Sequence, residues 1–207
     1  MGEPGEPGLD EADLAGSWLE QFVRWHRALR EAGVAEPDAM VLATADAGGA
    51  PSARSVLLRG VDERGFEFFT NLRSRKGREL AVNPRASLVF PWYELRRQVI
   101  VVGVARQVES ERADEYFASR AYGSRIGALA SEQSSVISGR AELERAAAQL
   151  RERHPPCGEV PRPGHWSGFR VQPETVEFWQ GRRDRLHDRL RFRRDPAAGW
   201  VVERLSP

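Results

Sequence analysis

Large apolar residues near the start of the chain recur at helical spacing. Four of them follow one another at intervals of four, three and four positions: Trp18, Phe22, Trp25 and Leu29. Residues three and four apart share one face of an α-helix, so this spacing predicts an amphipathic helix over residues 16–32, which Gly33 would end.

From residue 39 onward the apolar runs become short and are separated by turn residues, which is typical of consecutive β-strands. Three antiparallel strands with glycine-containing turns are predicted at residues 39–46, 52–61 and 66–71. A short helix follows, with Ser74 as its N-cap and with Asn83 and Pro84 at its end. Two further strands are predicted at residues 86–93 and 96–109. Helical spacing returns over residues 110–129 and 137–153, and strand-like segments close the chain at about residues 168–180, 185–194 and 199–204.

The order of these elements favours a mainly β protein with flanking helices (α+β). Strands that follow each other with little helix between them fit an antiparallel sheet or barrel better than a doubly wound parallel sheet. No repeat of fixed period and no shift in composition marks a second core, so residues 15–207 are expected to form one domain. The acidic, Gly- and Pro-rich residues 1–14 are expected to form a disordered tail.

Composition and charge exclude several classes of protein. The chain has 207 residues, with 31 basic and 30 acidic side chains and a net charge of +1. This balance argues against a protein dedicated to nucleic acids or membrane surfaces. The single cysteine, Cys157, cannot form an intrachain disulfide, and no apolar run reaches the roughly 18 residues of a spanning helix. The N-terminus lacks the basic start and apolar centre of a signal peptide, so a soluble, cytoplasmic protein without a nucleic-acid or membrane partner is expected.

Common catalytic and binding motifs are missing as well. The sequence has no GxGxxG after a strand, no GxxxxGK[ST], no HExxH and no paired CxxC, which argues against Rossmann dehydrogenases, P-loop enzymes and zinc hydrolases. His26 and His154 have no clustered carboxylates or thiols beside them, so no metal site is expected. Cys157 lies in a Pro- and Gly-rich loop without a predicted helix N-terminus next to it, which argues against a catalytic thiol.

Ser74, Arg75 and Lys76 begin the short helix and form a candidate anion site. Unpaired backbone N–H groups, the positive end of the helix dipole and two cationic side chains all favour a bound anion there. Alternatively, both cations are solvated residues of the first turn. Because cations are slightly unfavourable at a helix N-terminus, the local sequence leaves the two interpretations about even.

Seven arginines lie within residues 182–194. On a β-strand, Arg185, His187 and Arg189 would project from one face over about 13 Å, with apolar residues on the opposite face. This row could line a pocket for an anionic, planar ligand. The alternative is a solvated outer strand face.

Tyr116 and Arg120 lie four positions apart in the helix predicted over residues 110–129. They therefore share a face and could hold one ligand group together. A structural aromatic residue beside a surface arginine is the alternative.

Several motifs, in order along the chain, closely resemble those of the pyridoxamine 5′-phosphate oxidase family, FMN enzymes of vitamin B6 metabolism. The C-terminal motif is VEFWQGRRDRLHDRLRFRR at residues 176–194. The others are RSVLLR at 54–59, FTNLRSRKG at 69–77, FPW and RRQV around 90–99, YFASRAYGS at 116–124, EQSS at 132–135 and the closing ERLSP. The resemblance runs from about residue 36 to the C-terminus and includes the family's C-terminal signature at residues 166–207.

The resemblance implies an FMN-binding split barrel, which is a Greek-key antiparallel β-barrel with flanking helices. It also implies a homodimer with FMN at the subunit interface. By motif position, the implied FMN contacts are Arg54, Ser55, Val56, Leu57, Leu58, Arg59, Phe69, Thr70, Arg75, Lys76, Gln98, Gln133, Ser134, Trp179 and Arg189. Arg75 and Lys76 then coincide with the candidate anion site, where a phosphate would gain charge-assisted hydrogen bonds.

The resemblance also implies a substrate and a reaction. The implied substrate contacts are Arg59, Tyr116, Arg120, Ser124, Arg185, Leu186 and His187. Three of them, at spacings of four and four on one helix face or its continuation, would bind the substrate phosphate: Tyr116, Arg120 and Ser124. Arg185 and His187 would cover the pyridine ring and are the expected catalytic residues. The implied reaction oxidises pyridoxamine or pyridoxine 5′-phosphate to pyridoxal 5′-phosphate, with O2 as acceptor and H2O2 as product, and FMN carries the redox step.

The chain departs from the family pattern at two places. Arg59 stands where the family has lysine, and no N-terminal Arg-x-x-Tyr lid precedes the first predicted helix. Of the 31 basic side chains one is a lysine, Lys76, so a general exchange of lysine for arginine accounts for Arg59. Retention of lysine at position 76 suggests that a compact ammonium is needed there.

Three alternatives follow from the same features. A flavin oxidase of secondary metabolism, similar to the phenazine-biosynthesis branch of the family, acts on a reduced aromatic ring and also lacks the lid. Without a substrate phosphate Arg120 would be left unpaired, which favours the vitamin B6 reaction. A non-catalytic split barrel that carries or senses flavin or haem would not need Arg185 and His187. An arginine-rich nucleic-acid binder would show a steep salt dependence of DNA binding.

Overall fold

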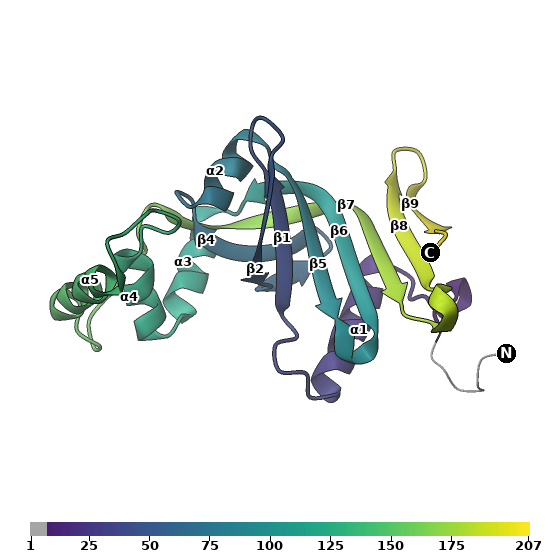
Figure 1. Cartoon of the computed structure of the whole chain (residues 1–207), viewed down its shortest axis with the longest axis horizontal. Coiled ribbons are helices and arrows are strands. Elements are labelled where there is room, and N and C mark those ends of the chain that lie inside the picture. The colour runs from purple at the N-terminus through teal and green to yellow at the C-terminus, as the bar shows by residue number, and fades with distance from the viewer. Residues whose placement is uncertain (1–7) are drawn as a thin grey trace.

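A single curled antiparallel sheet forms the centre of the molecule in the computed structural model, which describes residues 8–207 (Figure 1). The sheet has nine strands in the order β2-β1-β5-β6-β7-β4-β3, with β8 paired to β7 and β9 paired to β8. Their bounds are β1 Ala39–Ala45, β2 Pro51–Leu57, β3 Gly60–Asp62, β4 Gly65–Asn71, β5 Arg85–Trp92, β6 Arg97–Gln107, β7 Trp166–Gln180, β8 Asp188–Asp195 and β9 Gly199–Arg204. The sheet curls until β2 contacts β4. The mainly β, antiparallel fold with flanking helices is therefore confirmed.

Strand β7 changes its partner halfway along, and this splits the sheet. Residues 166–171 pair with β4 and residues 175–180 pair with β8, while β6 runs along the other edge. The change occurs at Pro173, beside a register shift next to Gly103. A Cβ on Gly103 would lie 2.0 Å from the carbonyl oxygen of Gln172, so the close approach requires glycine. The hairpin of β8 and β9 therefore stands apart from the rest of the barrel (Figure 1).

Helix α1 (Trp18–Glu31) packs its apolar face against the sheet. Ser17 caps it by accepting a hydrogen bond from the backbone N–H of Glu20. The four apolar residues that predict this helix are all buried, and the ring of Phe22 lies 5.0 Å from the rings of Phe66 and Phe90. The prediction over residues 16–32 is therefore confirmed, with the ends shifted by two residues and one.

The remaining helices are α2 (Arg75–Val82), α3 (Ser110–Ser119), α4 (Tyr122–Ala130) and α5 (Arg140–Arg153). Helices α3, α4 and α5 gather at the end of the molecule opposite β8 and β9 (Figure 1). A second, smaller apolar cluster lies under them and comprises Phe117, Ile126, Val160 and Trp166. The single helix predicted over residues 110–129 is wrong, because Arg120 takes an extended conformation with ψ 146° and separates α3 from α4.

The N-terminal segment also differs from the expectation of a disordered tail over residues 1–14. Residues 1–7 lie outside the described residues, but Leu9 is 3% exposed and belongs to the main core. Arg204 of β9 donates hydrogen bonds to Asp10 and Glu11 at 2.8 and 2.6 Å. The acidic residues that suggest disorder thus have a cationic partner near the other end of the chain, which local composition does not reveal.

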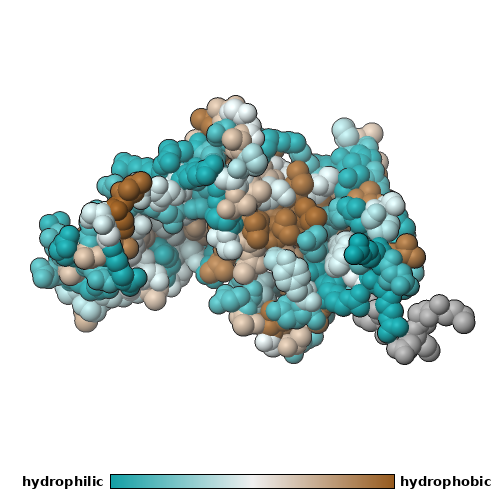
Figure 2. Space-filling view, viewed as in Figure 1, coloured by the Kyte–Doolittle hydropathy of each residue, from teal (hydrophilic) through white to brown (hydrophobic). Residues whose placement is uncertain are grey.

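The outer face of the central strands is apolar. Figure 2 shows apolar side chains gathered over β1, β5 and β6. Val41, Val89 and Ile100 are neighbours across these strands, and Val102 on the same face is 38% exposed. An apolar patch on a sheet face is typical of a protein–protein contact. Within residues 8–207 no helix is long and apolar enough to cross a membrane.

Candidate active site

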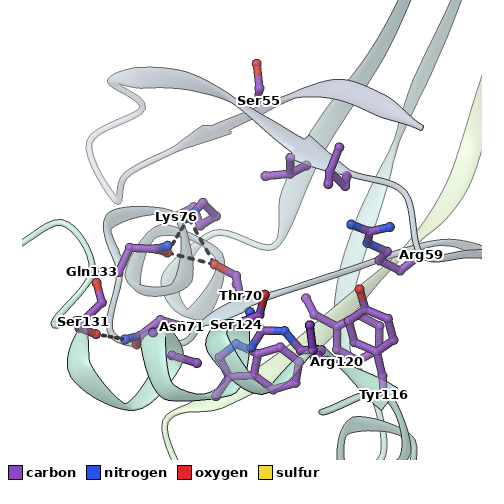
Figure 3. Close-up of a pocket in the computed structure, with 17 residues that line it drawn as sticks. Ser55, Arg59, Thr70, Asn71, Lys76, Tyr116, Arg120, Ser124, Ser131 and Gln133 are labelled. Atoms are coloured by element: carbon purple, nitrogen blue, oxygen red, sulfur yellow. Dashed lines mark hydrogen bonds between the residues drawn. The ribbon is translucent and has the colours of Figure 1, made fainter. Parts of the chain in front are cut away.

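A pocket of about 690 Å³ lies between the barrel and helices α2, α3 and α4 (Figure 3). Of its lining residues, Arg59, Lys76 and Arg120 are cationic and none is acidic. The lining comprises Ser55, Val56, Leu57, Arg59, Phe69, Thr70, Asn71, Lys76, Tyr116, Arg120, Ala121, Ser124, Gly127, Ala128, Ser131, Gln133 and Trp166. A pocket of this size with convergent cations and no carboxylate suits an anionic ligand.

One end of the pocket is built around Lys76 (Figure 3). Its ammonium donates hydrogen bonds to Gln133 Oε1 at 2.8 Å, Thr70 Oγ1 at 3.1 Å and Ser74 Oγ at 3.4 Å. The side chain is buried at 8% exposure, and all three partners are neutral oxygens. Burial, with a smaller contribution from the charge of Arg54, lowers the pKa of Lys76 from 10.5 to about 8. The ammonium thus lacks the counterion that a buried charge requires, and a bound anion would supply it.

Arg75 does not join Lys76 at this end. Its Nε donates to Glu79 Oε1 at 2.8 Å, one helical turn away. Arg54, from β2, also approaches Glu79, at 3.3 Å. Burial would raise the pKa of Glu79, but hydrogen bonds from Thr44, Ser52, Arg75 and Arg54 lower it to about 2. Glu79 therefore pairs with both arginines outside the pocket lining, and within residues 8–207 Lys76 has no carboxylate partner.

The other end of the pocket is built around Arg120, between α3 and α4 (Figure 3). Its guanidinium lies 4.9 Å from the ring centre of Trp166, and within residues 8–207 its buried Nη1 has no hydrogen-bond partner. Burial lowers the pKa of Arg120, with a further contribution from the charge of Arg59. Ser124 and Ala121 line the pocket where α4 begins, and Ala121 provides no side-chain cap. Uncapped N–H groups and an unpartnered guanidinium together make this end a second candidate anion site.

Aromatic rings form the wall beside this second site. Phe69 stacks on Tyr116 with ring centres 4.1 Å apart and on Trp166 at 5.5 Å. The guanidinium of Arg59 lies 6.0 Å from the ring centre of Tyr116. Tyr116, Arg120 and Ser124 thus line one pocket as expected, although Tyr116 belongs to α3, Ser124 to α4 and Arg120 to the link between them.

A second group of candidate residues lies on the sheet away from this pocket. Gln98, Trp179 and Arg189 are direct neighbours across β6, β7 and β8. Gln98 and Trp179 also line a smaller cavity with Tyr93, Arg96 and Arg97. Glu177 holds Arg189 in a bidentate ion pair at 2.7 and 3.1 Å and raises its pKa.

The predicted strand over residues 185–194 begins later than expected. β8 starts at Asp188, so Arg185, His187 and Arg189 do not form a row on one strand face. Residues 183–185 form a short 3₁₀ turn in which Arg185 has φ 61°. A non-glycine residue in this left-handed region is strained by about 1–2 kcal/mol, and such strain is typical of functional sites.

His187 is held by its neighbours in this turn. Its Nδ1 accepts a hydrogen bond from the backbone N–H of Arg182 at 3.0 Å, and its ring lies 4.6 Å from Trp179. Arg185 and Leu186 are exposed, with Leu186 at 72%. Within one chain the β8 end and the α3–α4 end lie on opposite sides of the molecule (Figure 1).

Eleven of the candidate residues therefore line the main pocket: Ser55, Val56, Leu57, Arg59, Phe69, Thr70, Lys76, Tyr116, Arg120, Ser124 and Gln133. The others lie outside it: Arg54, Leu58, Arg75, Gln98, Ser134, Trp179, Arg185, Leu186, His187 and Arg189. Sequence reasoning missed Asn71, Ser131 and Trp166, which also line the pocket. Asn71 lies inside the quoted motif at 69–77 and donates a hydrogen bond to the carbonyl oxygen of Ser131 at 3.3 Å. Trp166 ends a Pro- and Gly-rich loop, and no local pattern indicates that it lies beside Arg120.

Comparison with protein families finds two matches that together cover most of the chain. A family model described as pyridoxamine 5′-phosphate oxidase matches residues 26–154. A model described as pyridoxine 5′-phosphate oxidase C-terminal dimerisation region matches residues 166–207. The second match coincides with the predicted C-terminal signature segment.

Curated relatives match along nearly the whole chain. A Streptomyces avermitilis protein named pyridoxine/pyridoxamine 5′-phosphate oxidase is 53% identical over 204 residues, which cover 97% of this chain and 91% of the relative. A Burkholderia multivorans protein of the same name is 56% identical over 201 residues, with 96% and 93% covered.

Solved structures show the same fold. PhzG from Burkholderia lata 383, in complex with tetrahydrophenazine-1-carboxylic acid, superposes with a TM-score of 0.89 and 34% identity and covers 95% of both chains. A pyridoxamine 5′-phosphate oxidase-related, FMN-binding protein from Nostoc punctiforme superposes with a TM-score of 0.73 at 16% identity, with 94% of this chain and 100% of the other covered. The split-barrel fold is thereby confirmed.

Proposed function

The chain belongs to the pyridoxamine 5′-phosphate oxidase family, and we propose that it oxidises pyridoxamine or pyridoxine 5′-phosphate to pyridoxal 5′-phosphate with FMN as cofactor. One observation carries this proposal: the main pocket has two separate cationic ends and no acidic lining residue. Two phosphorylated ligands, one at each end, would neutralise both.

The Lys76 end suits the phosphate of FMN. Lys76, Thr70 and Gln133 would hold it, because their cluster contains a buried ammonium without a counterion. Ser55, Val56 and Leu57 of β2 border the same pocket and would contact the rest of the cofactor. When bound, FMN accepts the two electrons removed from the substrate and passes them to O2, which gives H2O2.

The Arg120 end suits the substrate phosphate. Arg120 Nη1 is an unpartnered donor, and Ser124 and the uncapped N-terminus of α4 lie beside it. Tyr116 and Arg59 complete this end. A phosphate held here would fix the ring in place, so that binding energy from a group outside the reaction orients the reacting carbon. The alcohol then loses two electrons and two protons to give the aldehyde, and the amine also consumes water and releases ammonia.

A second copy of the chain would complete the site. Residues 166–207 match a dimerisation region, and they contain Trp179, Arg185, His187 and Arg189. None of these four residues lines the main pocket of its own chain, and β8 lies at the end of the molecule opposite α3 and α4 (Figure 1). The apolar outer face of β1, β5 and β6 gives a surface on which two copies could pack (Figure 2). In such a homodimer, Arg185 and His187 of one copy would cover the substrate ring bound by the other.

An aerobic assay of the purified, FMN-loaded protein tests this function. We expect H2O2 production with pyridoxine 5′-phosphate and pyridoxamine 5′-phosphate, and at least about a hundredfold lower kcat/KM with pyridoxine, which lacks the phosphate that Arg120 would bind. Pyridoxine is the matched control because its ring and alcohol are the same. An apoprotein that takes up no FMN, or equal rates with and without the substrate phosphate, would refute the proposal.

A dihydrophenazine carboxylic acid belongs in the same assay as a second candidate substrate. The superposition on PhzG, a protein crystallised with tetrahydrophenazine-1-carboxylic acid, is the observation that favours it. The higher identity to pyridoxine/pyridoxamine 5′-phosphate oxidases and the unpartnered Arg120 favour a phosphorylated substrate. Turnover of the phenazine acid alone would reverse this preference.

A further inference from the structure

Glu67 is a buried carboxylate on the strand that carries Phe69 and Asn71 of the pocket lining. It belongs to β4 and is 5% exposed. Side chains two positions apart on a strand point to the same face, so Glu67 shares its face with Phe69 and Asn71, which line the pocket. A carboxylate is buried to this extent in proteins mainly when it is paired.

Two arginines from different elements share this carboxylate. Arg112 of α3 donates from Nε and Nη2 to Glu67 Oε2 at 3.1 and 3.0 Å. Arg170, the cross-strand neighbour of Glu67 on β7, donates to Oε1. Gly60, opposite Glu67 on β3, leaves room for the group, because a Cβ there would lie 2.8 Å from Oε2. One carboxylate therefore joins β4, β7 and α3.

Contacts that begin at Glu67 lead to the substrate end of the pocket. The guanidinium of Arg112 lies 5.6 Å from the ring centre of Phe69, which in turn stacks on Tyr116 at 4.1 Å and 23°. Arg112 and Tyr116 are four apart on α3 and so share a helix face. The backbone oxygen of Glu67 also accepts a hydrogen bond from the N–H of Arg59 at 2.8 Å. The backbone of Glu67 thus holds Arg59, and its carboxylate is connected to Tyr116 through Arg112 and Phe69.

We propose that Glu67 is a positioning residue for the substrate phosphate, acting through Arg112 and the ring of Phe69 on Tyr116. This inference rests on the proposed function, which assigns this end of the pocket to the substrate. The hydrogen-bond partners of Lys76 do not include Glu67 or Arg112. Loss of the Glu67 charge should therefore weaken substrate binding and leave intact the Lys76 cluster that would hold the cofactor phosphate.

The test compares Glu67→Gln and Arg112→Gln with the wild type as FMN-loaded proteins. We expect the KM for pyridoxine 5′-phosphate to rise about tenfold or more in both, because small misplacements of a positioning group cost up to about a hundredfold. The kcat should stay within about twofold, because a phosphate contact that is equally strong in the ground and transition states changes KM and not kcat. The Kd for FMN should also stay within about twofold. Arg112→Lys keeps the charge and should recover part of the loss. Glu115→Gln is the matched control, because Glu115 is 3.7 Å from Arg112 but 70% exposed, and it should leave all constants unchanged.

Hydrogen exchange of the same variants gives a readout that needs no substrate. We expect the amides of α3 to exchange at least about tenfold faster in Glu67→Gln and Arg112→Gln, with α2 unchanged. An unchanged KM in both variants, or a parallel fall of kcat, FMN affinity and melting temperature, would overturn the positioning role. A wild type that does not oxidise the substrate would refute the proposed function. Unchanged exchange of α3 in both variants would separately refute the role of Glu67.

Discussion

Lys76 gives the sharpest prediction, because the proposed binding of the cofactor phosphate depends on the charge of its ammonium. Its pKa falls from 10.5 to about 8, chiefly because it is buried without an acidic partner. At about 1.36 kcal/mol per pKa unit, the charged form costs roughly 3 kcal/mol in the apoprotein. A phosphate dianion beside the ammonium would offset this cost and return the pKa toward its usual value.

The affinity for FMN should therefore depend on pH. Below pH 8 the ammonium is already charged, so the Kd should be nearly constant. Above pH 8 binding must take up a proton, and the Kd should rise toward tenfold per pH unit. The hydrogen-bond partners of the ammonium, Thr70, Ser74 and Gln133, do not titrate. Flavin fluorescence titrations of the apoprotein between pH 7 and 9.5, at constant ionic strength, measure this dependence.

The stability of the apoprotein should also depend on pH. The unfolded chain holds the Lys76 proton up to pH 10.5 and the folded chain only up to about pH 8, so stability should rise with pH between these values. Lys76→Met removes the buried charge and should stabilise the apoprotein by up to about 3 kcal/mol at pH 7 while weakening FMN binding. Lys76→Arg keeps its charge and should bind FMN with a flat pH profile, whereas Arg78→Met, on the exposed side of α2, should behave as wild type. A wild-type Kd that is constant from pH 7 to 9.5, or an equal slope in Lys76→Arg, would refute the reasoning.

Three further predictions concern other parts of the chain. Arg185→Ala should lower kcat about a hundredfold or more and keep FMN binding, as steady-state kinetics and flavin absorbance would show; near-normal turnover would remove Arg185 from the site. Glu79 has a pKa lowered to about 2, so it contributes stability above pH 4.5 that is lost as the pH falls to 2. Urea unfolding should show that Glu79→Gln is less stable than the wild type by about 3 kcal/mol at pH 7, and that this difference vanishes near pH 2. A difference that does not depend on pH would contradict this. Leu9→Ala should cost about 2–3 kcal/mol in urea unfolding because Leu9 is buried in the core, and a change under 0.5 kcal/mol, about the level of a surface substitution, would show that the segment is loosely attached.

Local patterns in the sequence predict the regular elements well. The helix at Trp18–Glu31 follows from apolar residues at helical spacing, and the start of α2 follows from Ser74, whose hydroxyl accepts the N–H of Gly77. These features depend on residues close together in the chain. The break at Arg120 has no such signal, because neither proline nor glycine marks it.

Contacts between distant segments could not be predicted in this way. The change of partner in β7 depends on Gly103 meeting Gln172, and the packing of Leu9 depends on a core that is formed largely by residues far from it in the chain. The turn at Arg185 replaces the expected strand because His187 accepts a backbone hydrogen bond from Arg182. The motif resemblance assigns the candidate residues to FMN and to the substrate. Only the fold shows which of them line the main pocket and which lie outside it.

The near-equal numbers of basic and acidic side chains conceal a spatial separation of charge around the pocket. Outside the pocket lining, Glu79 pairs with Arg54 and Arg75, and Glu67 pairs with Arg112 and Arg170. In the described part of the chain, the three cations that line the pocket, Arg59, Lys76 and Arg120, have no carboxylate paired with them. The arginines outside the lining therefore already have carboxylate partners, whereas the three cations of the lining are available to anionic ligands. The same composition that argues against a polyanionic partner is therefore compatible with two small anionic ligands, because the carboxylates near the pocket pair with arginines outside its lining.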